Sequence, residues 1–274
     1  MDALGRYTAR HMLEAADEYG LPASPRLLRE WVQLGLLDRP EVRGRGRAFG
    51  VRGTYSSNQR QLFVALLQLR ERKARRAQLA KIPVWLWLRW GDEYAPLRQV
   101  RRALETWEIG IRSASWSKTD ARAAQLATAV SAPGARQHKK RWFRTVLSDI
   151  ATDAAYDRSE FISAGREIMD PDRTNSFRGP VDASLGPEQY ADLIDARLEA
   201  ISRLSEFSDE EFSEARDFYR YARADYAQRY GGFHLDPDIG RIFEAPTDNR
   251  EIDSACLRLV EILGLLSGAR VDRR

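Results

Sequence analysis

The side chains whose type and spacing could do chemistry are the arginines of residues 24–55, SPRLLREWVQLGLLDRPEVRGRGRAFGVRGTY. Arg26 and Arg29 lie in a leucine-rich segment. A second group follows, alternating with small or apolar residues: Arg43, Arg45, Arg47 and Arg52. A guanidinium group carries a permanent positive charge and binds phosphate oxygens through paired hydrogen bonds. The pattern therefore favours contact with a phosphate-bearing partner.

Local signals predict the elements that carry these arginines. Ser24 followed by Pro25 predicts a helix start, because serine accepts hydrogen bonds from free N–H groups of the first turn and proline supplies a preset φ. The helix is expected over residues 24–34 and to end at Gly35. The glycine-rich residues 42–55 predict a basic hairpin. A short helix followed by a basic hairpin is the layout of a winged helix-turn-helix, which presents two cationic surfaces to DNA.

The predicted helix has an apolar part and a polar part. Its apolar side chains supply more area than one narrow stripe requires, and we expect most of them in the core: Leu27, Leu28, Trp31, Val32 and Leu34. The exposed candidates for a DNA groove are then Arg26, Arg29, Glu30 and Gln33. The hairpin arginines are expected to add affinity more than specificity, because contacts with phosphates carry no base information.

Further helical patterns flank this segment. Apolar residues at helical spacing predict a first helix over residues 7–20. Ser56 with Gln59 three residues later predicts a capping box at the start of another helix. The charged run 70–81 is expected to be a solvated helix end or a surface that contacts the nucleic-acid backbone. Pro83 is expected to restart the chain into a new, buried helix that carries VWLWLRW.

Residues 95–111 predict a helix with an apolar stripe. Its members recur at alternating spacings of three and four: Leu97, Val100, Leu104, Trp107 and Ile111. Such a stripe suits a partner helix. Two alternatives stay open, dimerisation through this stripe and packing of the stripe inside the chain.

The first part of the chain resembles the DNA-binding domain of MerR-family transcription regulators. The resemblance rests on Arg29 and Trp31 before Gly35-Leu36-Leu37, and on a basic hairpin that closes on Gly53-Thr54-Tyr55-Ser56 before a helix containing Gln59; it covers residues 7–107. It implies a helix that enters the major groove, with Arg29 and Trp31 at the backbone-gripping positions. It also implies that Tyr55 closes a wing contacting flanking phosphates. Glu30 stands where the family usually has an aromatic residue, and this wing is longer and richer in arginine.

The second half of the chain has the opposite charge. Residues 1–82 carry 16 Lys/Arg against 8 Asp/Glu, and residues 151–274 carry 16 against 26. A basic half can neutralise phosphates, whereas an acidic half would be repelled by DNA.

Helices are predicted at five stretches of the second half: 119–131, 136–158, 187–207, 209–230 and 250–266. Capping boxes are predicted at Ser208 with Glu211 and at Asp248 with Glu251, and residues 169–186 are predicted to form a linker or mobile loop.

Several classes of function lack support in the sequence. The single cysteine and three separated histidines provide no metal-binding constellation, and no catalytic motif is present, so we expect no metal, no cofactor and no enzymatic activity. Asp170 with Asp172 and Asp236 with Asp238 are expected to be loop or cap acids. No apolar run is long enough to span a bilayer and no signal peptide is recognisable, which predicts a cytoplasmic protein without a membrane partner.

These observations predict a mostly α-helical protein with two domains. Residues 1–111 would form a MerR-like winged helix-turn-helix with its following helices, and residues 112–274 an all-helical regulatory or interaction domain. The predicted function is sequence-specific binding of double-stranded DNA by a homodimer that regulates transcription. RNA polymerase and a small-molecule effector are further candidate partners. The alternatives are an architectural or excisionase-like protein that bends DNA without an effector, and a helical adaptor whose basic half binds an acidic protein.

The candidate DNA-binding residues yield a first prediction. They are Arg26, Arg29, Gln33, Arg43, Arg45, Arg47, Arg52 and Tyr55. Replacing one hairpin arginine by alanine should lower the slope of log K against log salt concentration by about one for each phosphate that the variant no longer neutralises. Titrations of duplex DNA at several salt concentrations measure this slope. An unchanged slope in all four single variants would remove the hairpin from the interface.

Overall fold

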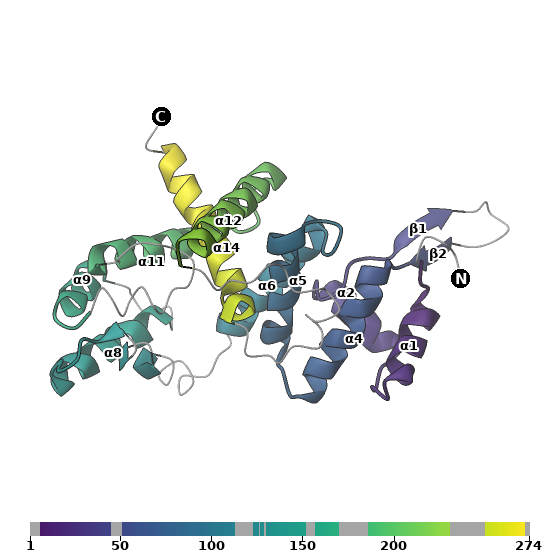
Figure 1. The fold of residues 1–274 in the computed structure, drawn as a ribbon, viewed down its shortest axis with the longest axis horizontal. Helices are drawn as coiled ribbons and strands as arrows, with labels where there is room; N and C mark the ends of the chain where they lie inside the picture. The colour runs from purple at the N-terminus through teal and green to yellow at the C-terminus, as the bar shows by residue number, and fades with distance from the viewer. Residues whose placement is uncertain are drawn as a thin grey trace. The chain divides into compact units, whose positions relative to one another are not determined.

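The computed structural model shows a mostly helical chain with one two-stranded hairpin (Figure 1). It describes residues 6–44, 51–112, 123–125, 127–128, 130–151, 157–169, 186–230 and 250–271. The chain forms two compact units. The first comprises Met1–Gly110 with His234–Cys256, and the second comprises Ile111–Phe233 with Leu257–Arg274. The first unit therefore also contains residues 234–256, which a division of the chain at residue 111 would place in the second unit.

The first unit begins with two short helices, α1 (Ala9–Glu18) and α2 (Pro25–Gln33). As predicted, the side chain of Ser24 caps α2 by accepting a hydrogen bond of 3.1 Å from the N–H of Leu27. Both helices bury one face, because their apolar residues recur at helical spacing. Met12 of α1 and Leu28 and Trp31 of α2 lie in the core, whereas Leu27, Val32 and Leu34, which were also expected there, are half-buried.

A hairpin of β1 (Glu41–Gly44) and β2 (Val51–Thr54) follows α2. The strands are antiparallel, with Glu41 opposite Thr54 and Gly44 opposite Val51. Reciprocal backbone hydrogen bonds of 2.9 and 2.7 Å between Tyr7 and Tyr55 hold the end of the hairpin to the segment before α1. In Figure 1 the hairpin projects away from α1 and from α4 (Ser57–Glu71). The predicted hairpin is therefore present, and its first strand begins one residue earlier than expected.

The prediction that Pro83 begins a new helix is wrong. Helix α5 (Arg76–Trp90) contains Pro83 in its interior. An interior proline costs roughly 3 kcal/mol because it removes a backbone hydrogen bond and crowds the preceding turn. Here the cost is offset by burial, since α5 is apolar on most sides and its expected core segment is buried, including Trp85, Trp87 and Leu88.

The apolar stripe of α6 (Leu97–Arg112) packs inside the chain. Val100, Leu104 and Trp107 are each at most 4% exposed. A stripe already buried in the single chain cannot also pair with a second copy unless this packing is undone. Of the two alternatives for residues 95–111, the structure therefore favours internal packing for these three positions.

The second unit contains α8 (Gln137–Ala151), α9 (Arg158–Arg166), α11 (Pro187–Ser202) and α12 (Asp209–Tyr230). The single helix predicted over 136–158 is wrong, because α8 ends at Ala151 and a separate helix starts after Asp157. Asp157 caps α9 by accepting hydrogen bonds from two backbone N–H groups. The capping box of Ser208 and Glu211 is confirmed, with hydrogen bonds of 3.2 and 2.8 Å in the two directions.

Aromatic packing and ion pairs join α8, α9 and α11. The ring centroid of Phe161 lies 5.5 Å from that of Phe143 and 5.9 Å from that of Tyr190. On the surface, Arg158 of α9 pairs with both Asp192 and Asp195 of α11. Several predicted features lie outside the described residues: most of the loop 169–186, the capping residue Asp248, and the aspartates Asp170, Asp172, Asp236 and Asp238.

The last helix, α14 (Arg250–Val271), contributes to both units, because the division falls between Cys256 and Leu257. In the second unit it packs closely on α11: a Cβ at Gly264 would collide with the carbonyl oxygen of Ala196. Among the described residues, no helix is long and apolar enough to cross a membrane.

The start of α14 is joined to α5 by a buried ion pair, which yields a prediction. Both carboxylate oxygens of Glu251 lie 2.8 Å from Nη1 of Arg89, and the Glu251 and Arg89 side chains are 12% and 4% exposed. Glu251→Ala should lower the free energy of unfolding by about 3–5 kcal/mol, because it leaves the Arg89 charge buried without this partner. Urea unfolding followed by tryptophan fluorescence measures the change.

A neighbouring ion pair supplies the control. Asp253 of α14 pairs with Lys81 of α5 at 2.8 Å, but its side chain is 58% exposed. Asp253→Ala should cost no more than ~1 kcal/mol, as is usual for surface pairs. Equal losses of stability in the two variants would show that the burial of Arg89 does not matter to stability.

Candidate nucleic-acid interface

The polar face of α2 is exposed. Arg26, Arg29 and Gln33 all reach solvent, as predicted. Within the part of the chain that the structure describes, no carboxylate pairs with Arg26 or Arg29. Arg29 makes one weak interaction, a hydrogen bond of 3.3 Å from Nε to the carbonyl of Pro25. Both guanidinium groups therefore keep most of their donors available to a ligand.

The opposite face of α2 is held in the core. Leu28 and Trp31 are 2% and 3% exposed, and the Trp31 ring meets Phe63 of α4 edge to face at 5.5 Å. Aromatic pairs in this geometry add to the stabilisation that burial provides. This packing confirms the expected core role of Trp31 and leaves almost none of its ring for the DNA-backbone contact that the resemblance implies. It also fixes which face of α2 points outward.

The C-terminal end of α2 is pressed against α6. Gly35 has a φ of +70°, and a Cβ there would collide with Arg102 and with the backbone of Ala103. Only glycine satisfies both conditions without strain. The hydroxyl of Thr106 on α6 donates a hydrogen bond of 2.8 Å to the carbonyl of Leu34. These contacts set the direction in which the chain leaves α2.

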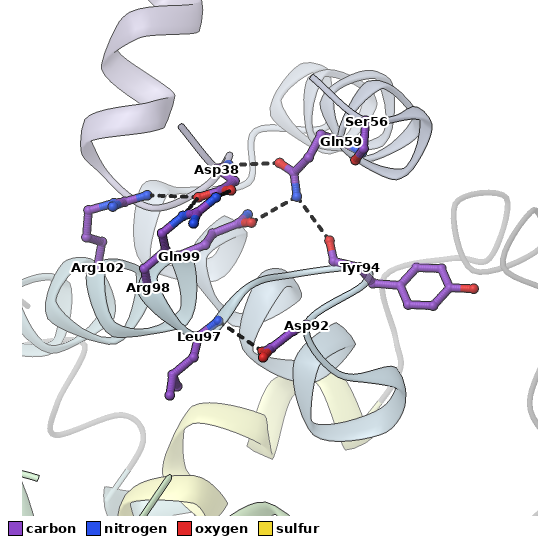
Figure 2. Close-up of polar contacts among 9 residues, drawn as sticks. All are labelled: Asp38, Ser56, Gln59, Asp92, Tyr94, Leu97, Arg98, Gln99 and Arg102. Atoms are coloured by element: carbon purple, nitrogen blue, oxygen red, sulfur yellow. Dashed lines mark hydrogen bonds and ion pairs between the residues drawn. The ribbon is translucent and has the colours of Figure 1, made fainter. Parts of the chain in front are cut away.

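A buried hydrogen-bond network then holds the segment after α2, and Gln59 of α4 is at its centre (Figure 2). The side-chain oxygen of Gln59 accepts from the backbone N–H of Asp38 at 2.8 Å. Its amide nitrogen donates to the carbonyl of Tyr94 at 3.0 Å and to the side-chain oxygen of Gln99 at 2.9 Å. Gln99 in turn donates to the carbonyl of Leu36 at 3.0 Å. Both donors of the Gln59 amide and one of its two acceptor positions are thus used.

Asp38 adds an ionic contact to the same segment. Figure 2 shows Arg98 and Arg102 reaching its carboxylate from α6. Arg98 binds it in a bidentate way, at 2.9 and 2.5 Å, and this hydrogen bonding raises the pKa of Arg98. Nη2 of Arg102 lies 3.5 Å from the carboxylate, and burial lowers the pKa of Arg102. Asp38 thereby ties the start of the hairpin segment to α6.

The capping box predicted at Ser56 and Gln59 is half wrong. Ser56 does cap α4, accepting a hydrogen bond of 3.2 Å from the N–H of Gln59. The Gln59 side chain does not return the bond to Ser56, because it is turned inward to Asp38, Tyr94 and Gln99. A glutamine at this position satisfies the local pattern, and only its distant partners decide where the side chain goes.

Of the four hairpin arginines, two lie in the described strands. Arg43 and Arg52 lie opposite each other in the register of β1 and β2, and Arg45 and Arg47 lie outside the described residues. Tyr55 is only 7% exposed, so little of its ring is available to a ligand. Burial, with a smaller contribution from Asp38, raises the pKa of Tyr55. These observations favour a structural role for Tyr55, joining the hairpin to the residue before α1.

The predicted DNA-binding residues do not include the basic turn between α4 and α5, although the charged run 70–81 was expected to be a solvated helix end or a surface that contacts the nucleic-acid backbone. We define this turn as residues 70–76, RERKARR, which hold five cations and one acid. Arg70, Arg72, Lys73 and Arg75 are exposed, and Lys73 has a left-handed φ of +68°. Arg76 pairs at 2.5 Å with Glu30, which brings the turn beside the exposed face of α2. The charge density of this run is a signal in the sequence, but its position next to α2 is not.

No protein-family model, no curated protein and no solved structure matches this chain. The chemistry of the site therefore follows from its own residues. Exposed hydrogen-bond donors and positive charges lie on α2 and on the basic turn, which the ion pair of Arg76 with Glu30 brings together, and a buried network holds the segment after α2. Such an array suits a polyanion with acceptor groups.

The network yields a prediction about stability. Gln59→Leu keeps the approximate volume of the side chain but removes the partner of two buried groups, the N–H of Asp38 and the side-chain oxygen of Gln99, and of the half-buried carbonyl of Tyr94. Since each buried group left without a partner costs roughly 1–3 kcal/mol, the two buried groups alone should lower the free energy of unfolding by about 2–6 kcal/mol. Gln61→Leu, on the exposed face of the same helix, should change it by less than ~0.5 kcal/mol. Urea unfolding of both variants provides the comparison, and similar stabilities would contradict a central role for Gln59.

Proposed function

We propose that this protein is a sequence-specific regulator of transcription that binds double-stranded DNA through a MerR-like winged helix-turn-helix. The observation that carries the proposal is the exposed face of α2, where Arg26 and Arg29 have no carboxylate partner among the described residues while the opposite face is anchored by Leu28 and Trp31. A rigidly mounted helix with free donors is what reading a DNA groove requires.

The size and chemistry of α2 suit the major groove. An α-helix with its side chains is about 10–12 Å in diameter and fits the ~12 Å width of that groove, and the nine residues of α2 provide about two and a half turns. Arginine donates two hydrogen bonds to guanine, and glutamine pairs with adenine through one donor and one acceptor. Arg26, Arg29 and Gln33 thus provide groups that distinguish bases as well as groups that contact phosphates.

The neighbouring cations provide binding that does not depend on sequence. The hairpin carries Arg43 and Arg52 in register, and the basic turn exposes Arg70, Arg72, Lys73 and Arg75. Each phosphate neutralised releases counterions, which makes such contacts strong at low salt. These two elements would position the helix on the duplex, and α2 would supply the base contacts.

Selection of bound duplexes from a random pool tests the proposal, followed by titration of the selected sequence. Arg29→Ala should weaken binding by roughly 5- to 150-fold, the cost of about 1–3 kcal/mol expected for one good arginine contact. Arg220→Ala, at an exposed arginine of α12 in the second unit, removes the same charge and should leave the affinity within about twofold.

Other results would favour other functions. Selection of no consensus, together with bending of many unrelated duplexes, would indicate an architectural protein. Absence of duplex binding at low salt would contradict the proposal and would favour a helical adaptor whose basic half binds an acidic protein. Equal effects of Arg29→Ala and Arg220→Ala would show that α2 is not the contacting surface.

A further inference from the structure

Glu30 is the one acidic residue on α2, and it lies on the face proposed to meet DNA. It follows Arg29 directly, four residues after Arg26 and three residues before Gln33. Its side chain is 34% exposed. A carboxylate at this position would repel phosphates, so its presence in an otherwise cationic surface needs a physical reason.

Arg76 of α5 determines how Glu30 is held. Its Nη2 lies 2.5 Å from Oε1 of Glu30, and the Arg76 side chain is 68% exposed. The ion pair offsets the negative charge and limits the rotamers of the carboxylate. Among the described residues, no group donates a hydrogen bond to the second oxygen, Oε2. One oxygen is therefore anchored, and the other remains an acceptor.

A carboxylate differs chemically from its neighbours on α2. It only accepts hydrogen bonds, whereas arginine only donates and glutamine does both. In the major groove the cytosine N4 amino group is a donor that carboxylates recognise. Phosphates offer no donor at all, so an acceptor on this face can gain a contact only from a base edge.

We propose that Glu30, oriented by its ion pair with Arg76, accepts a hydrogen bond from the N4 amino group of a cytosine and so specifies one C·G pair of the bound sequence. This inference rests on the proposed function. It assigns to Glu30 a role in specificity, distinct from the role of the arginines around it. A purely structural role, in which Glu30 only tethers the basic turn to α2, makes a different prediction.

The test uses the full-length protein and the duplex that the wild type selects. Each base pair of that duplex is replaced in turn, and the affinities of wild type and Glu30→Ala are compared. At one C·G pair the wild type should discriminate by roughly 5- to 150-fold, and Glu30→Ala should discriminate little. At the other positions the two proteins should agree, and the affinity of Glu30→Ala for unrelated duplexes should stay the same or rise.

A change in the DNA gives an independent measurement. The cytosine at that position is replaced by the pyrimidin-2-one base, which lacks the N4 amino group. The wild type should lose affinity on this duplex, while Glu30→Ala should not, so the double-mutant cycle should show coupling. Arg220→Ala serves as the control and should behave as the wild type does.

The outcomes separate this inference from the proposed function. If the wild type selects no sequence, the proposed function fails. If it selects a sequence but Glu30→Ala keeps the same preference at every position, only the role of Glu30 fails. A uniform loss of affinity at all positions, with no change in preference, would assign Glu30 to tethering the turn and would also overturn the inference. Urea unfolding of Glu30→Ala verifies that the variant is folded.

Discussion

The first unit depends on the buried amide of Gln59. One side chain joins the segment after α2, the turn before α6 and α6 itself, through hydrogen bonds to Asp38, Tyr94 and Gln99. A buried polar group is tolerated only when its partners are present, so the three segments must approach in one arrangement for the network to form. The exposed face of α2 and the start of the hairpin are positioned as a consequence.

Arginine has two different roles in this unit, and the neighbouring carboxylates decide between them. Arg89 and Arg98 are held by Glu251 and Asp38, and they join separate segments of the unit to one another. Arg26 and Arg29 have no such partner among the described residues and remain available for a ligand. Composition counts both kinds as positive charge, although only the second kind can add to an interface.

Several acidic residues of the second half form ion pairs within the second unit. Asp192 and Asp195 pair with Arg158, and Glu188 pairs with Arg166, all within the second unit. Glu261 is 3% exposed and is bound by Arg197 and Arg258. These carboxylates stabilise contacts among α9, α11 and α14, and their charge is already matched by arginines of the same unit.

The sequence by itself determined features that arise within a few residues. Ser24 and Pro25 start α2, Gly35 ends it, and the apolar spacing buries Trp31, because caps, turns and helical faces depend on near neighbours. The tertiary structure alone decided features that depend on distant residues. Gln59 turns inward to partners 21 to 40 residues away, and Pro83 stays inside a helix because the surrounding core buries it. Long-range packing outweighs a local preference in both cases, and a local pattern contains no information about which distant residues will meet.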